Sequence, residues 1–451
     1  MKLPYEKPVI NKLQSGLMNK FGRSPAYARR VREHIEDVPI EDLVNEFGSP
    51  LYVYSEREIR RKHREMYSAF STRYPNVVFG WSYKTNYLQA ICAIMHQEGS
   101  IAEVVSQMEY EKARDFGIPG DQVIFNGPHK SPEILERAVS EGATINVDHL
   151  DEIYDLEQIA ENLGQTIRIG VRLNLDAGIY PQWSRFGFNL ESGQAYDTVK
   201  RISNGGKLEV AGLHCHIGTF ITEPEGYANQ VRKMVAFGYE IEDAFGFSME
   251  YIDIGGGFPS WNRLKSSYLA ADIAVPPIDE FAEEATRALT NSLRPGDFPK
   301  LILESGRALV DDAGYLVSTL VAAKRLPDGT RAYVLDAGVN LLYTSNWYKF
   351  NIDIDREVNG INENSVVYGP LCMNIDVVDE GVLLPPLSRG TRLTFSPIGA
   401  YNNTQWMQFI QYRPNCVLIG PDGQVEVIRE AEDLSDIQRR ERLPERLGLG
   451  G

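Results

Sequence analysis

The chain has 451 residues, of which 43% are hydrophobic and 24% are charged, and its formal net charge at pH 7 is -16. No apolar run approaches the roughly 18 residues that a membrane-spanning helix needs, and the acidic excess would repel nucleic-acid phosphates. The composition therefore excludes a membrane protein and a nucleic-acid-binding protein. It indicates a globular protein with one large barrel and a smaller domain, or with two to three ordinary domains.

The amino-terminal stretch MKLPYEKPVINK has no apolar core of the kind found in secretory signals, so we expect a cytoplasmic protein. The four cysteines, Cys92, Cys215, Cys372 and Cys416, lie far apart and form no CxxC pair. This spacing argues against a zinc knuckle and against a disulfide framework, so we expect no bound metal. Any function of a cysteine here is that of a single thiol.

Residues 1–48 are charged and broken by turn signals, and we interpret them as an extension that packs on the second domain. From Pro50 onward, beginning with the apolar run 51–55, strand-like runs alternate with helical patterns, which predicts parallel strands joined by helices. The strand-like runs that follow are 77–83, 101–106, 122–126, 144–148, 167–174, 210–218, 251–258 and 301–307. This number predicts a closed (β/α)8 barrel, which we assign to residues 49–311.

The pattern changes after about Leu309 to short apolar runs separated by Gly, Pro and Asp turns. These runs are 315–326, 331–338, 351–358, 364–372, 390–397, 411–420 and 424–430. They predict a β-rich second domain over residues 312–451. Its charged tail, 431–451, is typical of a solvated helix or a frayed end.

Lys84 ends the first barrel strand, and reacting groups of parallel barrels lie at the carboxyl ends of strands. Shielding by Phe79, Trp81 and Tyr83 would disfavour the ammonium form and lower the pKa of Lys84 toward that of a nucleophilic amine. Such an amine can form a Schiff base with an aldehyde. A lysine that extends its ammonium into water at a strand end is the alternative that this stretch leaves open.

The motif HCHIG places His214 and His216 on one face of a strand and Cys215 on the other. Two histidines on one face could bind a metal, but no third ligand follows at a recognisable spacing. A flat imidazole over a cofactor ring, or a histidine in the core, is favoured instead.

Gly255, Gly256 and Gly257 directly follow an apolar strand, so their backbone N–H groups could approach an anion closely. The motif does not match GxGxxG, and a structural turn remains open at this point. In ESGR, Glu304 could face a protonated ring nitrogen and Arg307 a phosphate or carboxylate, with a plain ion pair as the alternative.

In this order, the motifs resemble those of the pyridoxal-phosphate-dependent decarboxylases with an alanine-racemase-like fold, which include the diaminopimelate, ornithine and arginine decarboxylases. The resemblance runs from about Pro50 to Ile419. It implies a TIM-type barrel with a β-rich C-terminal domain, pyridoxal 5'-phosphate as the cofactor, and release of CO2 from an amino acid through an external aldimine.

The resemblance also implies roles for individual residues. YKTN is similar to Y-x-K-A-N, so Lys84 would bond to the cofactor, while His216 in HCHIGT would stack on its ring. Glu304 would face the ring nitrogen, and Arg307 the phosphate or a nearby carboxylate. In IAEVVSQMEY, Glu109 is retained, whereas Glu103 replaces the usual Asp. Further cofactor contacts are implied for Glu103, Thr219, Gly255, Gly256, Gly257 and Tyr401.

GPLCMNID is similar to a turn that reaches into the active site of the neighbouring subunit, which implies a homodimer and makes Cys372 the catalytic acid. Substrate contacts are implied for Arg185, Arg307, Met373 and Asp376. Met373 stands where relatives carry an acidic residue, and segment 336–350 lacks the arginine of diaminopimelate decarboxylases. We therefore expect a specialised amino acid whose tail carries no recognised ammonium.

Two alternatives remain open. A racemase of the same fold would share Lys84 and the phosphate loop, but would use a tyrosine in place of the cysteine turn. A non-catalytic regulatory relative would be expected to have lost residues such as Lys84 and Cys372, and both are present.

Overall fold

The computed structural model describes residues 31–179, 181–267, 269 and 271–448. Eight parallel strands in this part of the chain form a closed barrel, because β8 and β10 pair and join the two ends of the sheet. The eight are β4 (Val77–Ser82), β5 (Ile101–Val104), β6 (Val123–Phe125), β7 (Thr144–Val147), β8 (Ile167–Asn174), β10 (Leu208–Cys215), β11 (Tyr251–Asp253) and β12 (Lys300–Leu303). A short strand, β9 (Phe188–Asn189), extends the sheet beside β8. The predicted (β/α)8 barrel is confirmed.

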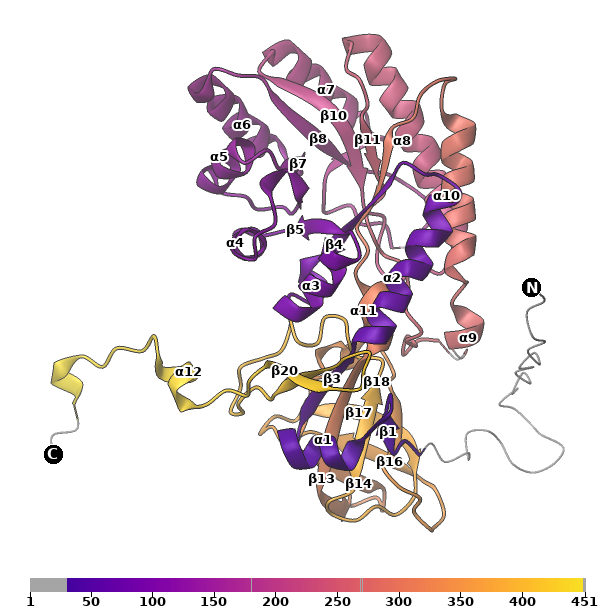
Figure 1. The fold of residues 1–451 in the computed structure, drawn as a ribbon, viewed down its shortest axis with the longest axis vertical. Helices are drawn as coiled ribbons and strands as arrows, with labels where there is room; N and C mark the ends of the chain where they lie inside the picture. Colours follow the sequence, from indigo (N-terminus) through magenta and orange to yellow (C-terminus); the bar gives the residue numbers. More distant parts are fainter. Residues whose placement is uncertain (1–30, 180, 268, 270, 449–451) are drawn as a thin grey trace.

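Helices surround the outside of the barrel (Figure 1). They are α2 (Glu56–Ser71), α3 (Gln89–Gln97), α4 (Gln107–Asp115), α5 (Pro132–Ser140), α6 (Leu150–Leu163), α7 (Gln194–Gly205), α8 (Pro224–Phe245), the short α9 (Ala271–Ala274) and α10 (Ile278–Ser292). The start of α5 follows from its sequence: the Ser131 hydroxyl accepts a hydrogen bond from the Ile134 N–H, and Pro132 occupies a first turn that needs no donor. Its apolar face, which includes Leu135, is buried against the barrel.

The second domain is built on a nine-stranded sheet, which confirms the predicted β-rich domain. Its strands are β3 (Leu51–Ser55), β13 (Gly314–Arg325), β14 (Arg331–Leu335), β15 (Asn351–Ile354), β16 (Glu363–Tyr368), β17 (Val377–Leu384), β18 (Arg392–Ser396), β19 (Cys416–Ile419) and β20 (Val425–Arg429). The long strand β13 is its centre, since it pairs with β3, β14 and β18.

The strand β3 lies in this second sheet, although the sequence analysis assigned residues 51–55 to the barrel. It pairs antiparallel with β13 and parallel with β19, and all five of its residues are buried. The sequence of a strand that is buried on both faces does not indicate which strands it pairs with. The sheet to which β3 belongs could therefore not be predicted from its sequence. From β3 in the second domain, the chain therefore enters the barrel at α2 and returns to the second domain at β13.

Residues 35–43 contribute buried side chains that pack on the second domain. A two-stranded hairpin, β1 (His34–Ile35) and β2 (Val38–Pro39), leads into α1 (Ile40–Phe47). Ile40 and Leu43 of this helix are buried in one apolar cluster with residues of β3, β13 and β19. Residues 1–30 lie outside the described residues.

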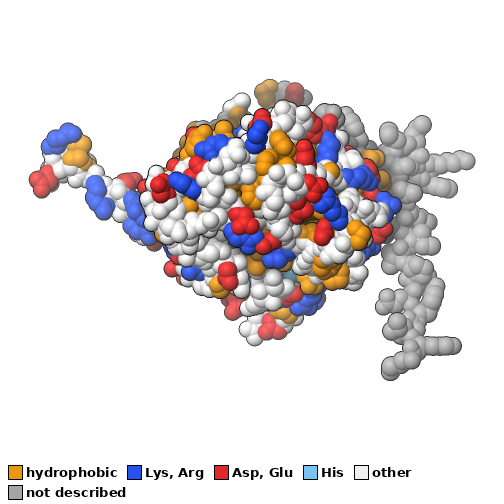
Figure 2. Space-filling model, turned by 90° about the horizontal axis from the view of Figure 1, so that it is seen from above, with side chains coloured by type: hydrophobic (Ala, Val, Ile, Leu, Met, Phe, Trp, Pro, Cys, Tyr) orange, Lys and Arg blue, Asp and Glu red, His pale blue; other side chains and the backbone are white. Residues whose placement is uncertain are grey.

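The C-terminal segment extends away from the body of the molecule (Figures 1 and 2). It contains α12 (Leu434–Gln438) and the 3-10 turn η6 (Glu445–Leu447), and neither buries a residue. This matches the solvated helix expected for the tail. On the face shown in Figure 2, acidic and basic side chains are interspersed. Among the described helices, none is both long and apolar enough to cross a membrane.

Candidate active site

Lys84 lies at the carboxyl end of β4, in the 3-10 turn η2 (Tyr83–Thr85). Its ammonium donates to Glu103 Oε2 at 2.5 Å, and Glu103, on the neighbouring strand β5, is fully buried. The Ser82 hydroxyl donates to the same oxygen. The ammonium of Lys84 is thus held by a buried carboxylate, while the lysine side chain itself is 37% exposed.

The pKa of Lys84 is shifted opposite to the expectation from the sequence. Burial disfavours the ammonium, as expected, but the charges of Glu103 and Glu304 outweigh burial and raise the pKa above its ordinary value. The sequence analysis considered only the aromatic residues before Lys84. It could not include carboxylates contributed by strands that lie beside β4 only in the fold.

Asn126 joins the two carboxylates and was not singled out in the sequence analysis. Its Nδ2 donates to Glu103 Oε1 at 3.1 Å and also to Glu304 Oε1. Asn126 directly follows β6, so it stands at a strand end as Lys84 does. That position was the only signal in the sequence, and asparagine at a strand end is usually a turn residue.

Glu304 follows β12 and forms a buried cluster with His214 and Asp253. Its Oε2 lies 3.2 Å from His214 Nε2. Burial raises the pKa of Asp253 well above its ordinary value, and the neighbouring Glu304 raises it further. Burial acts to raise the pKa of Glu304 as well, but His214 and Lys84 outweigh burial and lower it. Glu304 is therefore an anion beside a neutral Asp253.

The ligand atoms of His214, Asp253 and Glu304 all lie within 4.8 Å of one another. The sequence analysis found no third metal ligand near the HCHIG motif, because Asp253 and Glu304 come from the next two strands. Glu304 is hydrogen-bonded to His214 and Asn126, whereas His214 Nδ1 and Asp253 Oδ2 are buried with no hydrogen-bond partner among the described residues.

His216 is only partly buried, and its ring faces Trp183 edge-on at 5.2 Å between centroids. Its Nδ1 accepts a hydrogen bond from the Gly256 N–H at 3.1 Å. Burial, together with the charges of Arg172 and Lys84, lowers the pKa of His216 to about 3. The imidazole is thus neutral and suited to stacking on an aromatic ring. Thr219, three residues later, is exposed.

The loop Gly255–Gly257 packs tightly against its neighbours. A Cβ on Gly256 would stand 2.3 Å from the Glu304 carbonyl oxygen, and one on Gly257 would stand 2.5 Å from the Gly218 carbonyl oxygen. The Gly255 N–H donates to Asp253 Oδ1 at 2.9 Å, and the Gly256 N–H donates to His216. These first two N–H groups therefore hold the side chains of Asp253 and His216 in place and do not point freely at an anion.

Arg307, in the short helix α11 (Arg307–Val310), is buried between two aromatic rings. Its guanidinium lies 4.6 Å from the ring centroid of Tyr348 and 4.9 Å from that of Tyr401. Its Nη1 donates to Asp311 Oδ2 at 3.2 Å, while its Nε is buried with no partner among the described residues. An anion at this position would satisfy that donor.

Loops of the second domain cover the lysine turn. The Tyr401 N–H donates to the Thr85 carbonyl at 2.9 Å, and the Thr404 hydroxyl donates to the Lys84 carbonyl at 2.9 Å. Tyr401 has φ +64, a left-handed conformation that is uncommon for a non-glycine residue. The structure thus brings together Lys84, Glu103, His216, Glu304, Arg307 and Tyr401.

Cys372 and Met373 lie in the loop between β16 and β17. Cys372 is exposed and Met373 is partly exposed. In the described part of the chain, no hydrogen bond or ion pair links this loop to Lys84 or its carboxylates. The thiol of Cys372 is exposed, so it is accessible to another subunit.

Asp376 has a structural position that differs from its expected contact with substrate. It is buried, and its carboxylate oxygens accept hydrogen bonds from the Val339 N–H at 2.8 Å and the Leu371 N–H at 2.7 Å. The carboxylate thus fixes the turn that presents Cys372. Arg185, the other expected substrate contact, is exposed, and its guanidinium lies 5.1 Å from the Phe186 ring centroid.

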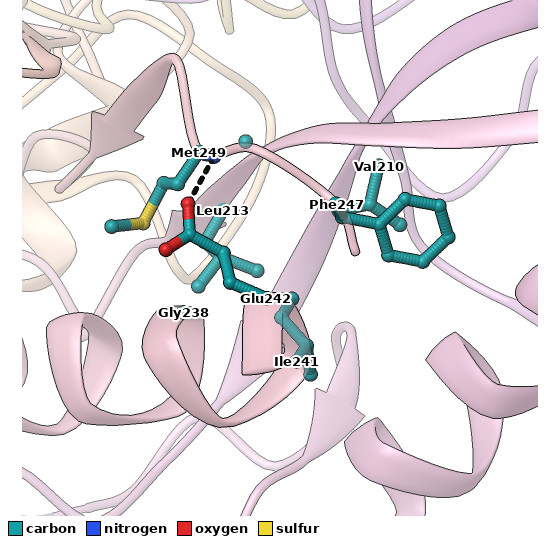
Figure 3. Close-up of a pocket in the computed structure, with 8 residues that line it drawn as sticks. Val210, Leu213, Gly238, Ile241, Glu242, Phe247 and Met249 are labelled. Carbon is teal, nitrogen blue, oxygen red and sulfur yellow. Dashed lines mark hydrogen bonds between the residues drawn. The ribbon is translucent and has the colours of Figure 1, made fainter. Parts of the chain in front are cut away.

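A small apolar cavity lies outside the strands, between β10 and α8 (Figure 3). It is lined by Val210, Gly212, Leu213, Gly238, Ile241, Glu242, Phe247 and Met249. The one charged group, Glu242, accepts a hydrogen bond from the Met249 N–H at 2.8 Å. This is a packing gap of the barrel wall, with no group available for chemistry.

Comparison with known proteins gives consistent results. Residues 56–311 match a model described as pyridoxal-dependent decarboxylase, pyridoxal binding domain. The chain is 30% identical over 422 residues to diaminopimelate decarboxylase from Methanothermobacter thermautotrophicus, covering 90% of this chain and 94% of that protein. It is 29% identical over 414 residues to the same enzyme from Aquifex aeolicus, covering 88% and 93%. A crystal structure of Methanocaldococcus jannaschii diaminopimelate decarboxylase with L-lysine matches with a TM-score of 0.84 and 26% identity, covering 94% of this chain and 99% of that one.

Proposed function

The chain belongs to the pyridoxal-dependent decarboxylase family, and from this premise we propose that Lys84 holds pyridoxal phosphate while the enzyme releases CO2 from a specialised amino acid. The observation that carries the proposal is the buried set around Lys84, in which Glu103 holds the amine and Glu304 remains an anion. The match to the pyridoxal-binding model covers the barrel that carries this set.

The residues at the barrel mouth fit the chemistry of pyridoxal phosphate. When bound, the cofactor supplies an electron-withdrawing ring that weakens the bonds at the α-carbon of an amino acid. Lys84 is the amine for its aldehyde, and neutral His216 is the planar group for one face of its ring. Glu304, an anion at the end of β12, would keep the ring nitrogen protonated.

Arg307, with Tyr401, is the proposed contact for the phosphate. The buried Nε of Arg307 with no partner in the described residues supports this role, because a phosphate oxygen would accept from it. Thr219 and Gly257 are proposed to complete the phosphate contacts. Gly255 and Gly256 contribute indirectly, because their N–H groups orient Asp253 and His216.

We also propose that the active enzyme is a homodimer in which Cys372 of the partner subunit protonates the α-carbon after CO2 has left. The exposure of Cys372 supports this arrangement. Asp376 supports it as well, because the turn that it fixes holds the thiol outward. A dimer would form each complete site from two chains.

The substrate is proposed to be an amino acid whose side chain does not end in an ammonium group. Met373 offers no charge to such a group, and no arginine occurs in segment 336–350. The one cation there, Lys349, donates to the Gly381 carbonyl at 2.9 Å. Arg185 and Arg307 are the proposed contacts for substrate carboxylates. The relatives are named diaminopimelate decarboxylases, so meso-diaminopimelate is the competing substrate.

The division into domains and the location in the cell are likewise proposals. Contacts support a barrel domain over residues 56–311 and a β domain formed by residues 31–55 and 312–448. The net charge of -16 is consistent with a cytoplasmic enzyme that binds neither nucleic acid nor membrane.

The test is CO2 release from a panel of amino acids by the purified protein, with chiral analysis of the product to exclude racemisation. We expect release from at least one amino acid without a terminal ammonium, and fast turnover of meso-diaminopimelate would refute the substrate proposal. Mixing Lys84→Ala with Cys372→Ala protein tests the shared site. Random exchange of subunits should restore about a quarter of the activity, whereas no recovery would place both residues in one chain's site.

A further inference from the structure

A line of hydrogen bonds crosses the interior of the barrel and ends on the two carboxylates of the site. The hydroxyl of Tyr251 on β11 donates to Asn146 Oδ1 at 2.8 Å, and Asn146 Nδ2 donates to Asn126 Oδ1 at 2.9 Å. Asn126 Nδ2 then donates to Glu103 Oε1 at 3.1 Å and to Glu304 Oε1. In each bond the donor is the residue farther from the carboxylates and the acceptor is the nearer one. All of these bonds therefore donate toward Glu103 and Glu304.

The space for this line is built into the barrel. Asn126 and Asn146 are 2% and 1% exposed, and Tyr251 is 8% exposed. A Cβ on Gly170 of β8 would stand 1.9 Å from Asn146 Oδ1 and 2.1 Å from the Tyr251 hydroxyl. Glycine at this position therefore leaves room for the first bond. Burial raises the pKa of Tyr251 well above its ordinary value, so its hydroxyl keeps the proton that it donates.

Hydrogen bonds in a buried chain polarise one another, and those that end on a charged acceptor are the strongest. Asn126 is the one described side chain that donates to both Glu103 and Glu304. The other groups that face these carboxylates are Ser82, Lys84, Glu109, His214 and Asp253.

We infer that Tyr251, Asn146 and Asn126 are positioning residues that hold the carboxyl groups of Glu103 and Glu304 at a fixed separation. Through this line the carboxylate at the lysine end of the cofactor is coupled to the carboxylate at its ring nitrogen. The inference rests on the proposed function, since it takes Lys84 and Glu304 as the groups at those two ends.

The first experiment compares the affinity of variant enzymes for pyridoxal phosphate, measured by visible absorbance. A buried hydrogen bond to a charged group is worth about one to two powers of ten in an equilibrium constant, so Asn126→Ala should weaken binding about tenfold or more. Tyr251→Phe, which removes only the distant hydroxyl, should weaken binding about twofold to fivefold.

Tyr74→Phe is the matched control, because Tyr74 is a buried tyrosine of the barrel domain whose hydroxyl donates to the Pro299 carbonyl at 2.7 Å. Its affinity for the cofactor should be unchanged. Unaltered affinity in both Asn126→Ala and Tyr251→Phe would overturn the inference.

The second experiment separates positioning from a general loss of packing. Asn126→Ala is combined with Glu103→Gln and, separately, with Glu304→Gln. If Asn126 acts on both carboxylates, replacing it should reduce the affinity for pyridoxal phosphate several-fold less in either background than in the unmodified enzyme. An equal loss of affinity in the unmodified enzyme, in Glu103→Gln and in Glu304→Gln would indicate that Asn126 has a purely structural role, and would contradict the inference.

Tyr251→Phe in the same two backgrounds provides the same comparison if Asn126→Ala does not fold.

Failure of the proposed function would give a different result. An enzyme that binds pyridoxal phosphate but releases no CO2 from any amino acid refutes decarboxylation, whereas the comparison of binding affinities still decides the role of Asn126.

Discussion

The backbone N–H of Tyr401 donates to the carbonyl oxygen of Thr85 at 2.9 Å, and this bond joins the β domain to the turn that carries the reactive lysine. The orientation of Lys84 therefore depends on contacts from both domains. Mutations at this junction should affect cofactor binding even where they touch no cofactor atom.

Asn86→Ala is expected to loosen this junction. Asn86 Nδ2 donates to the Gly399 carbonyl at 3.1 Å, and its Oδ1 accepts from Asn403 at 2.9 Å. Loss of these buried bonds should lower the free energy of unfolding by about 2 kcal/mol and weaken pyridoxal phosphate binding. Urea unfolding and absorbance titration measure the two effects. The exposed Gln158→Ala is the control, and equal stability of both variants would contradict the prediction.

Glu103→Gln is expected to lower the pKa of Lys84, because Glu103 is the nearest charge that stabilises the ammonium. The amine would then lose its proton at lower pH, and only the neutral amine attacks an aldehyde. The rate at which the cofactor-free enzyme takes up pyridoxal phosphate should therefore reach half its maximum at a lower pH than in the unmodified protein. Stopped-flow absorbance measures this rate.

The control for that measurement is Glu161→Gln, which removes an exposed carboxylate paired with Lys207 far along the chain. Its rate profile should match that of the unmodified protein. A midpoint for Glu103→Gln that stays in place, or moves to higher pH, would show that Glu103 does not set the charge of Lys84.

The raised pKa of Glu109 predicts that the stability of the protein depends on pH. Burial raises the pKa of this carboxyl to about 7 in the folded protein, from an ordinary value of 4.5. The folded state thus binds the proton more tightly than the unfolded state. The resulting stabilisation is complete below about pH 4.5 and is lost as the pH rises through 7.

Glu109→Gln should remove this loss, since its amide can still accept from the Val105 N–H and carries no charge. The free energy of unfolding of this variant, relative to that of the unmodified protein, should rise by up to about 3 kcal/mol between pH 5 and pH 8. Urea unfolding at the two values measures the gain. Glu111→Gln, at an exposed position of the same helix, should show none, and an equal change in both variants would rule out this assignment.

Gly256→Ala should displace Glu304 because the new methyl group would stand 2.3 Å from its carbonyl oxygen. The backbone must shift, which costs about 1 to 3 kcal/mol, and the affinity for pyridoxal phosphate should fall. The melting temperature and an absorbance titration test both effects. Gly448→Ala is the control, since its methyl group meets nothing closer than 3.4 Å. Normal affinity in Gly256→Ala would mean that the loop can relax without moving Glu304.

The barrel could be predicted because its strands are marked locally. Each is a short apolar run between turn residues, and eight of them alternate with helical patterns. The strand β3 has the same local appearance but a different sheet, since its partners β13 and β19 are far along the chain. Strand pairing depends on residues that are far apart in the sequence, so an apolar run alone does not predict it.

The groups of the site could be predicted only in part. Lys84, His216, Glu304 and Arg307 belong to recognisable motifs, and the fold gathers them. Asn126 and Asp253 stand alone in the sequence and gain their roles from neighbours on adjacent strands. Asp376 differs, because its motif implied a contact with substrate, while its carboxylate accepts from the Leu371 N–H of the same turn and from the Val339 N–H of a distant segment.

The position of β3 also sets an order of events during synthesis. The strand leaves the ribosome early, but its partner β13 begins about 260 residues later and β19 later still. The barrel between them is continuous in sequence and can close before the β domain exists, whereas β3 must stay unpaired at least until β13 has been synthesised. Nascent chains stopped after the barrel should therefore hold a folded barrel with an exposed, apolar amino-terminal strand, which is the segment most in need of a chaperone.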